Sequence, residues 1–216
     1  GEKNAASIYL LDENWKQKNI GLVSENFDID TKPLLSQIYY LEKALKPYGM
    51  VKKDTLENLV SENNSIILLP DMGHIEERIK SKLIDWVEKG GVLIRFAGPR
   101  LLNSNSDLLP IKLKNMEARY LGGALTWKTP LSIMKFDESS IFSGIKIPKE
   151  VKIKKQVIAA PSPELQDATW ARLEDGTPII TGSSAGNGWI VLFHITANNE
   201  WSNLPISGLF VSMMKR

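Results

Sequence analysis

Two short, almost wholly apolar strands, with an amphipathic helix between them, constrain the fold of this chain most strongly. Residues 65–69 read SIILL, and residues 92–96 read VLIRF. Apolar residues recur every four positions between them: Ile75, Ile79, Leu83 and Val87. This period predicts a helix over residues 75–89, which the pair Gly90-Gly91 ends. Such strands alternating with helices indicate a parallel sheet that helices cover on both sides.

The same alternation extends toward the amino end of the chain. Short apolar runs predict strands at residues 7–11 and 20–23, joined by a polar connector. A helix is predicted at residues 33–47, because apolar residues follow one stripe: Leu34, Ile38, Leu41, Leu45 and Tyr48. A shorter helix is predicted at residues 54–62. The amino-terminal half therefore has the order of a doubly wound α/β protein.

The carboxyl-terminal part has a different pattern, in which strands follow one another directly. The dipeptides Asp-Gly at 175–176 and Asn-Gly at 187–188 are strong hairpin signals. They predict an antiparallel meander of three strands: residues 169–173, 178–181 and 189–195. A final helix is expected to bury one apolar face: Ile206, Leu209, Phe210 and Met213. The meander should join an edge of the parallel sheet.

The domain organisation follows from length and from the absence of linkers. A chain of 216 residues fits one α/β domain, 1–216, and it contains no internal repeat or low-complexity segment. Residues 111–165 hold only short strand-like pieces, such as 119–121 and 151–153, and are predicted to be a β-rich insertion. The chain begins without methionine and stops on a predicted helix, so we expect it to be excised from a larger protein.

Composition excludes several classes of site and partner. The chain has no cysteine, which removes disulfides, thiolate metal ligands and cysteine nucleophiles. Its net charge of +2 is too small to indicate nucleic acid, and the lysines of the middle segment lack interleaved aromatic residues. No apolar run reaches the length of a membrane span. We therefore expect no nucleic-acid partner, no metal and no cofactor.

Candidate site residues lie where the predicted parallel strands end, because ligands of such sheets bind beyond the carboxyl ends of the strands. This rim is expected to contain seven residues: Asp71, His74, Gly98, Arg100, His194, Thr196 and Trp201. Asp71 and His74 could ligate a metal or form an acid–base pair; alternatively, Asp71 caps the helix near Ile75 and His74 is exposed. Arg100 could bind an anion or lie on the surface. His194 is either ligand-facing or a structural histidine that ties the loop 198–201.

The strand-and-turn phrase GGVLIRFAGPR resembles the class I glutamine amidotransferase-like fold. The ending GNGWIVLFHITANNEW is similar to the trehalose-utilisation branch of that fold. Longer phrases, among them WVEKGGVLIRFAGPRL and FHITANNEWSNLPISGLF, resemble a segment of large bacterial membrane proteins of unknown function, which begin with an aerotolerance (Bat-type) double-transmembrane region. The resemblance implies a mostly parallel, flavodoxin-like sheet with helices on both faces and the carboxyl-terminal antiparallel β-meander.

The sequence departs from this family at its catalytic positions. Class I amidotransferases carry a cysteine after the strand that matches residues 92–96, where this chain reads AGPR. The family's histidine is followed two residues later by a glutamate, whereas His194 is followed by Thr196. The resemblance therefore implies a non-catalytic module, a pseudoenzyme, because two members of the triad are missing.

The predicted function is binding of an unknown protein partner or small ligand at the carboxyl-terminal rim of the sheet. One alternative is a hydrolase, metal-assisted or acid–base, that uses Asp71, His74 and His194. A second is a carbohydrate-related binding domain, by analogy with the trehalose-utilisation branch. The resemblance places the module next to a bacterial membrane through flanking segments, on the periplasmic side or alternatively in the cytoplasm.

Overall fold

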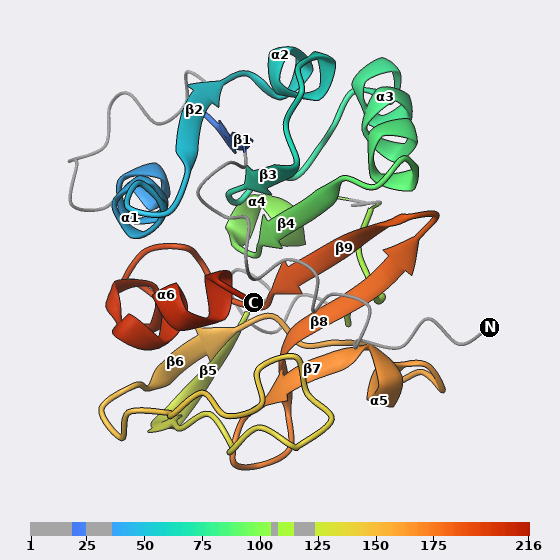
Figure 1. The fold of residues 1–216 in the computed structure, drawn as a ribbon. Helices are drawn as coiled ribbons and strands as arrows, with labels where there is room; N and C mark the ends of the chain where they lie inside the picture. Colours follow the sequence, from blue (N-terminus) through green and yellow to red (C-terminus); the bar gives the residue numbers. More distant parts are fainter. Residues whose placement is uncertain (1–18, 25–35, 105–107, 115–123) are drawn as a thin grey trace.

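The computed structural model describes residues 19–24, 36–104, 108–114 and 124–216. Its centre is a seven-stranded sheet of order β2-β1-β3-β4-β9-β8-β7 (Figure 1). In that order the strands are β2 (Met50–Asp54), β1 (Asn19–Val23), β3 (Ile66–Leu69), β4 (Val92–Phe96), β9 (Gly188–Phe193), β8 (Pro178–Ala185) and β7 (Thr169–Arg172). The predicted strands at 7–11 and 119–121 lie outside the described residues.

The sheet is parallel at its centre and antiparallel at one edge. Strands β2, β1, β3, β4 and β9 are parallel to one another, and β8 and β7 continue the sheet in antiparallel fashion. This arrangement confirms the predicted mixed sheet with a carboxyl-terminal meander. Strand β2 was not predicted. It is an outer strand that leaves much of its length exposed, and its sequence MVKKD lacks the apolar run of the central strands.

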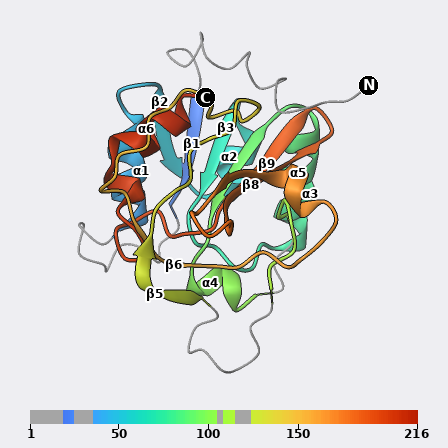
Figure 2. The same ribbon diagram turned by 90° about the horizontal axis from the view of Figure 1, so that it is seen from below.

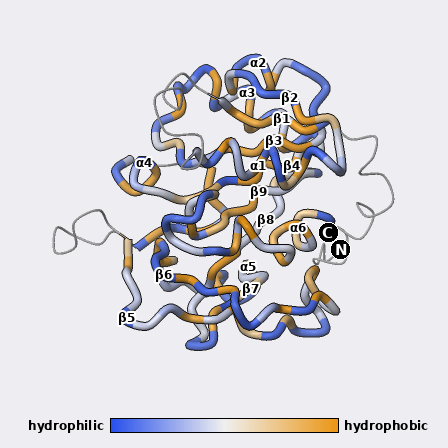
Figure 3. The backbone as a smooth tube through the Cα atoms, turned by 90° about the vertical axis from the view of Figure 1, so that its left-hand side faces the viewer, coloured by the Kyte–Doolittle hydropathy of each residue, from blue (hydrophilic) through white to orange (hydrophobic). Residues whose placement is uncertain are grey.

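Helices cover both faces of the sheet (Figure 2). On one face lie α2 (Leu56–Ser61) and α3 (Glu77–Glu88), and on the other α1 (Gln37–Leu45) and α6 (Gly208–Met214). Strand β3 supplies both layers, since Ile66 and Leu68 pack with α1 while Ile67 and Leu69 pack with α2 and α3. In Figure 3, much of the tube through β9 has the orange colour of hydrophobic residues. Among the described residues, no helix is both long and apolar enough to span a membrane.

The final helix is shorter than the predicted stripe. Ser207 caps α6 by accepting a hydrogen bond from the backbone N–H of Phe210. Ile206 therefore falls before the helix, in the short 3-10 turn η5 (Leu204–Ile206), and is 54% exposed. The expectation that Ile206 shares the buried face was wrong, because the Ser207 cap sets the helix start at Gly208, two residues beyond it.

Part of the predicted insertion at 111–165 forms a small second sheet of β5 (Leu125–Leu131) and β6 (Ile153–Gln156). A short helix, α5 (Leu165–Ala168), leads from it to β7. We call this insertion the excursion. Its apolar residues join the same cluster as α1, α6 and the central strands: Ile133, Phe136, Ile141, Phe142, Val151, Ile153 and Val157. The excursion therefore packs on the main sheet through shared core. That residues 1–216 form one domain stays a prediction.

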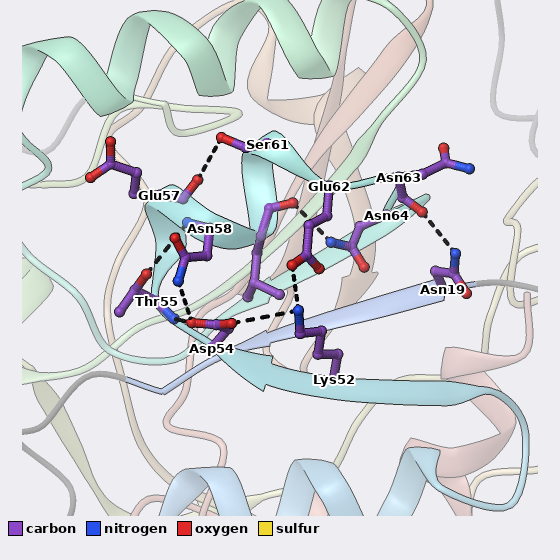
Figure 4. A network of polar contacts seen from close by, with 11 residues as sticks. Asn19, Lys52, Asp54, Thr55, Glu57, Asn58, Ser61, Glu62, Asn63 and Asn64 are labelled. Carbon is purple, nitrogen blue, oxygen red and sulfur yellow. Dashed lines mark hydrogen bonds and ion pairs between the residues drawn. The ribbon is translucent and has the colours of Figure 1, made fainter.

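Polar contacts join the edge strand β2 to α2 and the turn that follows it (Figure 4). The Lys52 ammonium lies between the carboxylates of Asp54 and Glu62. Asp54 also accepts hydrogen bonds from the Asn58 amide at 2.8 Å and the Thr55 N–H at 2.7 Å, which hold the pKa of its carboxyl below the ordinary value. Charged, internally paired groups of this kind protect an exposed strand edge from pairing with another chain.

Candidate functional site

A pocket of about 470 Å³ opens at the carboxyl ends of β1 and β3. The chain moves outward from β1 to β2 and then returns to β3 on the other side of β1, so the strand order reverses between β1 and β3. This is the position at which open α/β sheets bind ligands. The described lining residues are Val23, Leu69, Pro70, Asp71, Met72, Gly73, His74, Arg100, Asn103 and Ser104.

Asp71 joins the two loops that form the pocket. The residue is 8% exposed, and its carboxylate accepts hydrogen bonds from the backbone N–H groups of Arg100 at 3.0 Å and Leu101 at 2.8 Å. Asp71 thus caps α4 (Pro99–Leu102), whereas the N-cap of α3 is Glu76, which makes no capping side-chain bond. The expectation that Asp71 caps the helix near Ile75 was wrong. Burial raises the pKa of the Asp71 carboxyl, and the two N–H donors partly oppose that shift.

Gly98 allows this capping because a side chain there would occupy the place of the carboxylate. A Cβ on Gly98 would lie 2.3 Å from both Cγ and Oδ2 of Asp71. The backbone at Gly98 is extended, with φ of 178°, so the need for glycine is steric rather than conformational. The small residue after β4 therefore lets the strand end contact the end of β3.

Arg95 supports the floor of the pocket from inside the protein. It is 1% exposed, and its guanidinium donates to the carbonyl oxygen of Met72 at 2.7 Å and to that of Leu108 at 3.3 Å. These bonds hold the loop 70–74 from below. The sequence analysis did not identify Arg95 as a site residue. The sequence signal that could have identified it is a single cation in an otherwise apolar strand. A buried charge is costly unless it has partners, so such a residue is expected to hold other groups in place.

His74 and Arg100 are exposed and line the pocket from the two loops. Asn103 and Ser104 line it as well, and the sequence analysis missed both. Ser104 is committed to its own turn, since its hydroxyl donates to the Leu101 carbonyl at 3.0 Å. A nucleophilic serine requires a base within hydrogen-bond distance, and in the described residues no hydrogen bond joins Ser104 to His74.

His194 does not line this pocket. It is fully buried just beyond β9, with Nδ1 3.1 Å from the Val157 carbonyl and Nε2 3.0 Å from the Thr181 hydroxyl. A carbonyl only accepts, so Nδ1 carries the proton and Nε2 accepts from Thr181. Burial lowers the pKa of His194 to about 4, and its bond to Val157 opposes the shift. The side chain is therefore a neutral imidazole between the sheet and the excursion.

Thr196 and Trp201 accompany His194 rather than the pocket. Both are buried, and within the described parts of the chain the Thr196 hydroxyl has no hydrogen-bond partner. The Trp201 carbonyl accepts the backbone N–H groups of Lys154 and Lys155 on β6. The structure thus divides the predicted rim in two. Asp71, His74, Gly98 and Arg100 gather at the pocket, whereas His194 and Trp201 bond to the excursion and Thr196 is buried near them in the chain.

Comparisons with known proteins bear on the fold. Neither a protein-family model nor a curated protein matches the sequence. Among solved structures, the chain is similar to a cytoplasmic protein from Salmonella typhimurium LT2, with 12% identity over 91% of this chain and 96% of that one, at a TM-score of 0.66. A ThuA-like protein from Bacteroides uniformis has 11% identity over 93% of this chain and 89% of its own, at a TM-score of 0.56.

The fold also occurs as part of a larger enzyme. A beta-galactosidase from Rahnella sp. R3 matches 93% of this chain with 32% of its own length, at 12% identity and a TM-score of 0.56. At these identities the likeness concerns the fold alone. The chain has a flavodoxin-like α/β fold similar to that of ThuA-like proteins. The closing phrase GNGWIVLFHITANNEW had predicted this kind of fold.

Proposed function

We propose that this chain is a non-catalytic, amidotransferase-like module that binds a small ligand in the pocket between the ends of β1 and β3. The observation that carries the proposal is the pocket itself, about 470 Å³ in volume, at the point where the strand order reverses. Its two loops are held by the Asp71 cap and by the Arg95 bond to Met72. Polar groups from both loops converge on a preformed space.

The absence of a family nucleophile supports binding over catalysis. The segment after β4 reads Ala97-Gly98-Pro99-Arg100, and none of these side chains attacks a carbonyl carbon. The acid–base alternative needs Asp71, His74 and His194 in one crevice. Asp71 is engaged as a cap, and His194 is enclosed between Val157 and Thr181.

The carbohydrate alternative has less support from this pocket. The described lining contains no Phe, Tyr or Trp, the side chains whose large aromatic faces commonly pack on sugar rings. The beta-galactosidase and the ThuA-like protein share the fold with this chain, and their names carry no assignment of a sugar to it.

The cellular setting is part of the same proposal. The long phrases of the sequence resemble a segment of bacterial membrane proteins with a Bat-type transmembrane region. We place the module on the periplasmic side of such a protein, through flanking segments. Protease treatment of intact spheroplasts, followed by detection with an antibody against residues 36–104, tests the side. Protection of the epitope until the membrane is lysed would favour the cytoplasmic alternative.

The binding function is tested with a fragment library and ¹⁵N-resolved amide spectra. Ligands should perturb amides of residues 70–74 and 100–104. The variant Asn103→Trp places a large ring at an exposed lining position and should abolish these perturbations, whereas Asn199→Trp, exposed in the loop after β9, should not. Ligands that perturb other regions only, or that bind Asn103→Trp unchanged, would rule out this pocket as the site.

A further inference from the structure

We infer that the ligand of this pocket is a small organic anion, with its acidic group toward Arg100 and His74 and its apolar part toward β1 and β3. This inference rests on the proposed function and adds the chemistry of the ligand. It depends on which charges of the lining can face a bound molecule.

The one carboxylate of the described lining is not directed to a ligand. Both oxygens of Asp71 accept backbone N–H groups of α4, and the residue is 8% exposed. A cationic ligand would therefore compete with these bonds for the carboxylate. The negative charge of Asp71 therefore stabilises the contact between the protein's own two loops.

Two residues with donor side chains line the pocket from opposite loops. Arg100 is exposed in this lining, and a guanidinium binds carboxylates through two parallel N–H donors. His74 is exposed on the opposite loop and offers ring N–H donation. The loop that carries it rests on the buried guanidinium of Arg95, through the Met72 carbonyl. The chemistry of this lining matches an acceptor group with negative charge.

The remaining lining is apolar and belongs to strand ends. Val23, Leu69, Pro70 and Met72 form the part of the wall contributed by β1, β3 and the following loop. An inorganic anion would leave this wall and most of about 470 Å³ unused. A hydrocarbon portion of a few carbon atoms would bury it and gain from the removal of apolar surface from water. The ligand class is therefore an acid with an apolar body.

The experiment compares acids with their neutral amides, so that shape is held nearly constant. Amide spectra are recorded with acetate, 4-methylpentanoate, 3-phenylpropanoate, and the corresponding amides. We expect the two larger acids to perturb residues 70–74 and 100–104, to bind more tightly than acetate, and to bind roughly tenfold or more tightly than their amides. Arg100→Gln should remove this preference. Arg172→Gln, which removes the same charge from edge strand β7, should retain it.

The outcomes separate this inference from the function on which it rests. Equal binding of acids and amides at these residues would overturn the anionic assignment and leave the pocket as a binding site. Retention of acid preference in Arg100→Gln would overturn the role of Arg100. If no acid or amide of the panel perturbs these residues, the organic-anion assignment is wrong, and the fragment experiment with Asn103→Trp decides the binding function separately.

Discussion

His194 shows how one polar residue can be required inside an apolar core. Its ring is enclosed, and both nitrogens have partners on segments far apart in the sequence, Val157 of the excursion and Thr181 of β8. A buried polar group is tolerated when its hydrogen bonds are made, and its loss leaves those partners unsatisfied. The residue therefore joins the last parallel strand to two neighbouring elements.

Replacement of His194 by alanine should lower stability clearly. The Thr181 hydroxyl and the Val157 carbonyl would both lose a partner in a dry environment, at a cost of roughly 1–3 kcal/mol or more. For a chain of this size each kcal/mol lowers the melting temperature by about 2–4 °C. Thermal denaturation of His194→Ala beside His74→Ala, which removes an exposed imidazole, makes the comparison. Equal melting temperatures for the two variants would contradict the structural role.

The buried His194 also predicts how stability depends on pH. Its pKa is lowered from the ordinary 6.5 to about 4, so the unfolded chain binds a proton in that interval and the folded chain does not. Stability should therefore fall as pH decreases from about 6.5 to about 4, by about 3 kcal/mol in total. The raised pKa of Asp71 acts with the opposite sign, since stability falls there as pH rises above the ordinary carboxyl range.

Urea unfolding of the wild type and of His194→Gln at several pH values isolates the histidine, because the Asp71 contribution is common to both. The free-energy difference between the two proteins should shrink as the solution is acidified. Two parallel pH profiles would show that His194 does not titrate as its burial requires.

Gly98 is required by contact with Asp71. A methyl group there would lie 2.3 Å from the carboxylate, so Gly98→Ala must displace the cap or the strand end. We expect a loss of roughly 1–3 kcal/mol, as for other forced contacts in packed interiors. Gly208→Ala is the matched control, because a Cβ at that position meets nothing within 4 Å. Urea midpoints that are the same for both variants would show that the Asp71 loop yields freely.

At the scale of elements, the loop after β9 holds the excursion in place through hydrogen bonds. Residues 194–203 contact residues 150–157 through backbone and side chains: His194 with Val157, Trp201 with Lys154 and Lys155, Ser202 with Ile153, and Asn203 with Lys152 and Glu150. Asn203 accepts from the Lys152 N–H at 2.7 Å and donates to the Glu150 carbonyl at 2.7 Å.

Asn203→Ala should therefore loosen the start of β6 without unfolding the main sheet. Hydrogen exchange at the Lys152 amide should accelerate markedly, whereas amides of β3 and β4 should stay protected. Asn199→Ala, exposed in the same loop, serves as the control. Unchanged exchange at Lys152 would mean that the apolar contacts of the excursion suffice to hold it.

The parts of the fold that could be predicted are those in which burial leaves a local sequence pattern. Strands β3, β4 and β9 are apolar on both faces because both faces are covered, and α3 shows its period because one side packs on them. Strand β2 left no such pattern, since it is an exposed edge. The Asp71 cap was misassigned to the nearer helix because its true partners lie 29 and 30 residues away. The local hydrophobic pattern of a sequence carries no information about contacts between residues so far apart.

The division of the rim has the same origin. Sequence reasoning placed every residue after a parallel strand at one edge, and Asp71, His74, Gly98 and Arg100 do meet there. His194 follows a strand that neighbours β8 and the excursion, so its side chain is covered by elements whose position depends on the chain between 124 and 157. The residues at the end of a strand do not reveal how a distant segment will pack over them.

At the scale of the whole molecule, the sheet has a pocket where its strand order reverses, and the sequence has neither a cysteine after β4 nor a glutamate two residues after His194. The pocket between β1 and β3 depends on topology, and topology is preserved at the low identities of the structural neighbours. The segment after β4 depends on particular side chains. Here Gly98 leaves room for the Asp71 carboxylate, and Pro99 begins α4. The proposed function therefore separates binding from catalysis on one fold.

This separation predicts that the protein does not hydrolyse glutamine. Covalent attack on the amide needs a nucleophile with a base beside it, and Ala97, Gly98, Pro99 and Arg100 supply none. The neutral His194 is closed between Val157 and Thr181 and reaches no substrate. Incubation with glutamine should release no more glutamate than a heat-denatured sample, and Ser104→Ala should behave identically to the wild type. Glutamate release that depends on His194 or Ser104 would mean that the fold has assembled a hydrolytic site from other residues, and the module would then be an enzyme.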